Sequence, residues 1–92
     1  MSHAINQIRK NYRKIIKLQG DIKRIEFENS RKDYGLTDLK ELNYSIEFTR
    51  VLLQLLILNA LDGGLSADKI LEIVKQDPIY RGLISEWRYR RM

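Results

Sequence analysis

The chain has 92 residues, with 17 Lys and Arg against 12 Asp and Glu, a formal net charge of +5, one His and no Cys. The length predicts one domain, residues 1–92, and the missing cysteines exclude disulfide bonds, thiolate metal sites and a cysteine nucleophile. No segment reaches the roughly 20 consecutive apolar residues of a membrane-spanning helix, so we expect a soluble, cytoplasmic protein.

The first predicted helix, from about residue 5 to residue 29, is amphipathic with a basic outer face. Placed at about 100° per residue, its apolar residues fall in one arc and its basic residues, apart from Lys23, fall in the opposite arc. Residues 1–25 carry seven basic residues against one acidic residue, Asp21, a net charge of +6. The residues of this basic face are Arg9, Lys10, Arg13, Lys14, Lys17 and Arg24.

The second predicted helix begins after Gly35, with Thr37 or Asp38 as its N-cap, and ends near Leu61, where Gly63 supplies a left-handed stop. Nine of its last eleven residues, 51–61, are apolar and cover every side of the helix. A helix that is apolar all round has to be surrounded, either by the rest of a larger core or by another chain. Since only three other short helices are available, we expect a second copy to form part of the cover, as a homodimer. The residues expected in the interface are Leu52, Leu55, Leu56 and Asn59.

Two polar residues, Gln54 and Asn59, interrupt this apolar segment. If the helix is enclosed, both cannot reach solvent, and a buried amide in a pair of helices can fix register and copy number. The alternative is that one or both face an exposed gap or the rim of a pocket.

The third and fourth predicted helices are short and have clear starting points. Ser66 precedes the third helix as its N-cap, and Asp77 precedes Pro78, which takes the favoured first position of the fourth. No strand alternation appears anywhere. The sequence therefore predicts an all-α fold, a small four-helix bundle in which residues 1–4 and 90–92 are frayed.

Positive charge also gathers at the C-terminus, in a segment where aromatic and cationic residues alternate. Its arginines are Arg88, Arg90 and Arg91. Lys and Arg neutralise phosphates, and aromatic rings stack on unpaired bases, which predicts nucleic-acid binding. The alternative interpretation is that these residues keep a surface solvated and complement a helix dipole.

Residues 66–89 have some features of a DNA-binding helix-turn-helix. In that interpretation Arg81, Ser85 and Arg88 face the major groove. Leu71 and Lys75 stand where this motif usually has a small residue and a turn glycine, so two packed helices explain the spacing equally well.

The sequence offers little for catalysis. The one histidine, His3, lies near the terminus. Asp62, Asp68 and Glu72 form the closest acidic group, but Asp62 belongs to a helix stop and Asp68 is a favourable acid in a first helical turn. We therefore expect no enzyme activity, no cofactor and no metal. Membrane binding is disfavoured because the apolar face of the first helix, rich in Ile, is better explained as core.

Taken together, these patterns predict a non-enzymatic nucleic-acid-binding protein, such as a small transcription regulator of a phage or mobile element. The alternative is a protein interaction module, an adaptor, inhibitor or immunity-type protein that binds an acidic or apolar partner surface.

Overall fold

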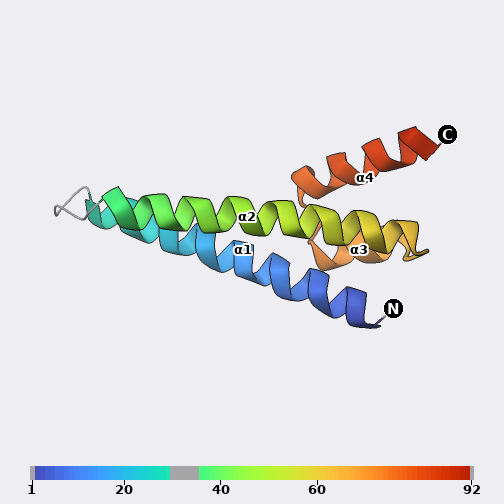
Figure 1. The fold of residues 1–92 in the computed structure, drawn as a ribbon, viewed down its shortest axis with the longest axis horizontal. Coiled ribbons are helices and arrows are strands. Elements are labelled where there is room, and N and C mark those ends of the chain that lie inside the picture. The colour runs from blue at the N-terminus through green and yellow to red at the C-terminus, as the bar shows by residue number, and fades with distance from the viewer. Residues whose placement is uncertain (1, 30–35, 92) are drawn as a thin grey trace.

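The computed structural model describes residues 2–29 and 36–91, and these residues form four helices and no strand (Figure 1). The all-α prediction is thereby confirmed. The helices are α1 (Ser2–Asn29), α2 (Leu36–Asp62), α3 (Ala67–Ile73) and α4 (Pro78–Arg91). Residues 2–4 and 90–91 are helical here, and their fraying stays a prediction.

Helices α1 and α2 form a long antiparallel hairpin, and α3 and α4 cover only the end that holds the N-terminus (Figure 1). The molecule is therefore elongated, measuring 51 × 25 × 19 Å. Of the predicted four-helix bundle, the number and kind of helices are confirmed, while the helices do not lie side by side along the whole length.

The core lies where all four helices meet. The apolar arc of α1 faces α2, as its helical periodicity predicts, and α3 and α4 each add buried residues from one face. The aliphatic side chains that are buried most completely are Ile8, Leu53, Ile57, Ile70, Val74 and Ile84. Toward the far end of the hairpin, Ile46 is the last buried residue of α2 among those described.

A pair of tyrosines joins the start of α4 to α1. The rings of Tyr12 and Tyr80 meet edge to face with 6.0 Å between centroids, and the Tyr12 hydroxyl donates to Asp77 Oδ2 at 3.4 Å. Burial raises the pKa of Tyr80 to about 12, so this ring stays neutral and packs as an apolar group. The contact fixes α3 and α4 against α1.

The helix ends were predicted with mixed success. Asp77 caps α4, because its Oδ1 accepts from the Ile79 N–H at 3.0 Å. Ser66 stands at the N-cap of α3, as predicted, and its carbonyl accepts from the Ile70 N–H at 3.2 Å, but its side chain makes no capping hydrogen bond. The left-handed residue after α2 is Gly64, with φ 98°, and not Gly63. Gly35 and the side chains of Thr37 and Asp38 lie outside the described residues.

Helix α2 is enclosed on one side only in this single chain. Asn59 is exposed and Gln54 is half-buried, so both polar side chains reach solvent without the buried partners that an enclosed helix requires. By length and composition, the segment Leu39–Asp62 is apolar enough to cross a membrane, contrary to our expectation. This is weak evidence for a membrane span, because the core helix of a soluble protein passes the same test.

Candidate nucleic-acid interface

The basic face of α1 points away from the core. Ile8, Tyr12 and Ile15 are buried in the core, so the basic residues on the other side of the helix are exposed to solvent. In the described part of the chain, none of the five cations between residues 9 and 17 lies within 4.0 Å of a carboxylate. These exposed cations are Arg9, Lys10, Arg13, Lys14 and Lys17.

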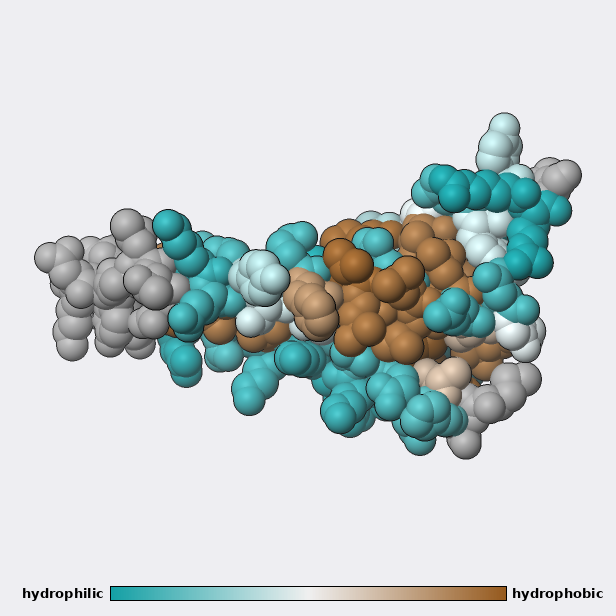
Figure 2. Space-filling model, viewed as in Figure 1, coloured by the Kyte–Doolittle hydropathy of each residue, from teal (hydrophilic) through white to brown (hydrophobic). Residues whose placement is uncertain are grey.

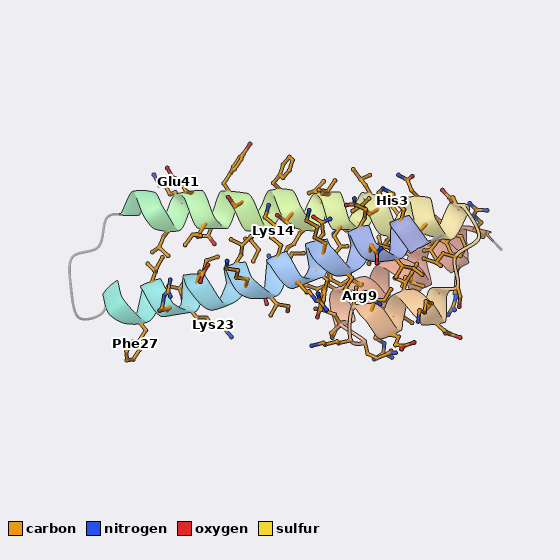
Figure 3. The ribbon with its side chains drawn as sticks, turned by 90° about the horizontal axis from the view of Figure 1, so that it is seen from below. His3, Arg9, Lys14, Lys23, Phe27 and Glu41 are labelled. Carbon is orange, nitrogen blue, oxygen red and sulfur yellow. The ribbon has the colours of Figure 1, made fainter. Side chains whose placement is uncertain are left out.

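Lys69 of α3 and Lys75, in the turn that follows α3, add two lysines to this face. Arg9 lies on the side of α1 that faces α3 (Figure 3), and a hollow of about 240 Å³ there is lined by both helices. We call its four cations, Arg9, Arg13, Lys69 and Lys75, the α1–α3 basic cluster. The remaining lining residues are Ile73 and Glu72, and Glu72 lies 3.9 Å from Lys69. Four cations therefore surround one carboxylate, an arrangement that attracts an anion.

The backbone places Lys75 at this hollow through an unusual turn. Lys75 and Gln76 have φ values of 53° and 57°, in the left-handed region that costs a non-glycine residue about 1–2 kcal/mol. Their N–H groups bond back to Glu72 O at 3.2 Å and Leu71 O at 2.8 Å, which ends α3. Strained residues of this kind gather at functional sites, and here the strain lies beside the basic cluster.

The sequence patterns did not identify Lys69 and Lys75. In the sequence, Lys69 and Lys75 stand next to apolar residues in and just after α3. Where they lie relative to α1 depends on how α3 packs against α1. No periodicity within one helix encodes that packing.

Arg24, the last predicted residue of the basic face, differs from the others. Its guanidinium lies 3.6 Å from Asp21 of the same helix, which partly offsets its charge. It also lies 15 residues beyond Arg9, about 22 Å along α1, where α3 adds no cations.

The C-terminal arginines are exposed, but each faces a carboxylate. Arg90 lies 2.8 Å from Glu86, Arg88 lies 3.9 Å from Asp68, and Arg91 bonds to Asp62. The structure therefore divides the predicted nucleic-acid-binding residues into a region of unpaired cations and a region of paired ones.

Asp62 is the centre of a small network at the end of α2. The Trp87 indole N–H donates to its Oδ1 at 3.0 Å, and the Arg91 guanidinium carbon lies 4.9 Å from the centre of the Trp87 ring. The indole hydrogen bond, aided by the charge of Arg91, lowers the pKa of Asp62 below its ordinary value. These contacts hold the end of α4 on α2.

The predicted homodimer residues divide between two environments. Leu52, Leu55 and Asn59 are exposed on the outward side of α2. Leu56 is half-buried and lines, with Asn59 and His3, a mostly apolar hollow of about 400 Å³ between α1 and α2.

The helix-turn-helix interpretation agrees with the burial of residues in α3 and α4. Ile70, Val74 and Ile84 are buried, and the three residues expected to face a groove, Arg81, Ser85 and Arg88, are exposed. Lys75 stands where the motif usually has glycine, and it does adopt a left-handed conformation. The motif itself stays a prediction.

Among the described residues, no group of three or more His, Asp or Glu side chains is placed to hold a metal ion. A comparison with protein-family models, curated proteins and solved structures finds no match for this chain. The case for a function therefore depends on the geometry of the chain itself.

Proposed function

We propose that this protein binds nucleic acid without catalysing a reaction, and that the α1–α3 basic cluster is its main phosphate-binding site. The observation that supports this is the hollow in which four cations, from α1, α3 and the turn after α3, surround a single carboxylate. Unpaired Lys and Arg side chains exchange condensed counterions for phosphates, which is the main source of sequence-independent affinity for nucleic acid.

The neighbouring cations extend the site along α1. Lys10, Lys14 and Lys17 lie on the same outward face, so the row from Arg9 to Lys17 covers about 12 Å of the helix. Duplex DNA carries one charge per about 1.7 Å of its axis, so several phosphates fall within this length. A role in transcription for a phage or mobile element stays a prediction from the sequence.

The same cations would also attract an acidic protein surface, the alternative partner. Treating a cell extract with nuclease before pulling down the tagged protein separates the two possibilities. Nucleic-acid binding predicts that the associated material disappears with nuclease, whereas a single stoichiometric protein that remains supports the alternative.

A pair of glycine substitutions tests the site without weakening the fold. Lys75→Gly removes a cluster cation and relieves a left-handed residue, and Gln76→Gly relieves its neighbour without changing the charge. We expect both variants to be as stable as the wild type or up to about 1 kcal/mol more stable. Affinity for a labelled DNA duplex should fall about 5- to 10-fold for Lys75→Gly and remain unchanged for Gln76→Gly.

Thermal unfolding and fluorescence anisotropy give the two readouts. Equal affinity of the two variants would place Lys75 outside the binding site and count against the proposal.

We also propose, as the sequence indicated, that the protein is a homodimer. The exposed apolar side of α2 supports this proposal.

A further inference from the structure

The outward side of α2 carries a row of large apolar residues that the described part of the chain leaves in solvent (Figure 2). Tyr44, Phe48, Val51 and Leu55 are 76%, 63%, 54% and 55% exposed. We call these four residues the α2 stripe. In Figure 2 apolar residues run along the middle of the molecule over α2, with hydrophilic residues of α1 below them.

The spacing of the stripe is that of a coiled-coil seam. Its members are separated by four, three and four residues, the alternation that keeps the a and d positions of a heptad facing a partner helix. Residues on one face of a helix repeat in this way, and the stripe spans 12 residues, less than two heptads. The spacing therefore fits another helix as the occupant.

The charge around the stripe favours a second copy of this basic chain. Between residues 43 and 59 the charged residues are Glu47 and Arg50, which bond to each other at 3.1 Å beside the stripe. Lys14 of α1 and Lys40 and Glu41 of α2 adjoin Tyr44 at one end of the stripe. From Phe48 to Leu55 the charges that α2 itself carries are paired, so two copies can approach along this part of the helix.

We propose that two copies pair through their α2 stripes with the helices antiparallel. One register then sets Tyr44 opposite Leu55 of the partner subunit and Phe48 opposite Val51 of the partner subunit, so that each aromatic ring faces a smaller side chain. A parallel pair would place ring on ring and align the two helix dipoles unfavourably.

The area of this contact is large enough for a dimer. Since a buried aromatic side chain covers roughly 150–250 Å² and these residues are mostly exposed, pairing two stripes with their flanking Leu52 residues would bury roughly 1,000–1,300 Å² in total. Specific interfaces need about 1,000 Å² or more. The stripe without its aromatic residues would not reach this value.

The antiparallel arrangement has a consequence for the basic faces. Helix α1 borders one flank of the stripe, where Lys14 lines a hollow of about 260 Å³ with Tyr44 and Phe48, and α4 borders the other flank at Asp62. A two-fold axis between antiparallel helices keeps equivalent flanks on the same side. The dimer would therefore present both α1 helices on one side, although the proposal of a dimer does not depend on nucleic-acid binding.

Mass measurement tests the interface directly. At about 100 µM, light scattering should give about twice the chain mass of 11.0 kDa for the wild type and a monomer for Phe48→Glu. Tyr89→Glu is the matched control, because Tyr89 is an aromatic residue of α4 with 78% exposure, away from the stripe, and this variant should remain dimeric. Circular dichroism should show unchanged helix content, and Leu55→Lys provides a second variant if Phe48→Glu does not fold.

A single spin label tests the orientation, because the chain has no cysteine. With a label on Lys40→Cys, the antiparallel register separates the two labels by about 28 Å along the helix axis, whereas a parallel pair holds them within about 15 Å. A monomeric wild type, or a dimer that tolerates both Phe48→Glu and Leu55→Lys, would overturn the proposed interface. A short label distance would overturn its direction.

The stripe could instead serve as a platform on which unpaired bases stack. In that case the wild type is a monomer, and Phe48→Glu lowers the affinity for single-stranded DNA by about tenfold or more. That pair of results would overturn the dimer and leave the basic cluster intact. Loss of binding in Lys75→Gly is a separate result, so the two proposals can fail independently.

Discussion

The two basic regions of this protein contain similar residues in different electrostatic settings. In the α1–α3 basic cluster, Arg9, Arg13 and Lys75 have no carboxylate within 4.0 Å in the described part of the chain. At the C-terminus, Arg88, Arg90 and Arg91 each face one. The charge available to a ligand therefore depends on which acidic residues the fold brings near, and not on the number of cations in a segment.

The largest expected effect comes from removing two cations from one region or the other. Arg9→Gln with Arg13→Gln should lower the affinity for a DNA duplex about 30- to 100-fold at about 100 mM salt. Arg90→Gln with Arg91→Gln changes the net charge equally, yet should lower it only about 3-fold, because these cations are already paired. Fluorescence anisotropy measures both, and equal losses would show that only total charge matters.

A smaller effect is expected from releasing a paired arginine. Asp62→Asn removes the carboxylate that holds Arg91 and accepts from the Trp87 indole, so affinity should rise about 2- to 5-fold while the thermal midpoint falls. Trp87 is the single tryptophan of the chain, and its emission should report the change.

Asp68→Asn is the matched control for Asp62→Asn. It removes the same charge from a looser pair, 3.9 Å from Arg88, and should leave the Trp87 emission unchanged. Identical emission in both variants would contradict the role assigned to Asp62.

Lowering the pH should weaken the contact between Asp62 and Trp87, because Asp62 loses its charge when it is protonated. Because the pKa of Asp62 is lower in the folded chain than its ordinary 3.8, the contribution to stability is present above that value. It is lost as the pH falls through the lowered pKa, and the midpoint of the change in Trp87 emission should therefore lie below pH 3.8.

Much of the fold could be predicted because it is encoded locally. The periodicity of Ile8, Tyr12 and Ile15 predicts the buried face of α1, and Asp77 with Pro78 predicts where α4 begins. These signals act within a few residues of one helix, and the structure confirms them.

The predictions that needed contacts between helices were less complete. The all-round apolar character of α2 predicted enclosure, but α3 and α4 cover only one end of the hairpin, so an apolar side remains exposed. Likewise, the sequence identified the basic face of α1 but neither the lysines that α3 and the turn after it add nor the carboxylates that face the C-terminal arginines.

The salt dependence of binding is the sharpest test of whether the α1–α3 basic cluster binds phosphates. For the wild-type protein, a plot of log affinity against log salt should have a slope of roughly −4, and the slope should shrink by about 1 for each cluster cation removed. Binding that is undetectable at about 50 mM salt, or that does not change with salt, would contradict the account.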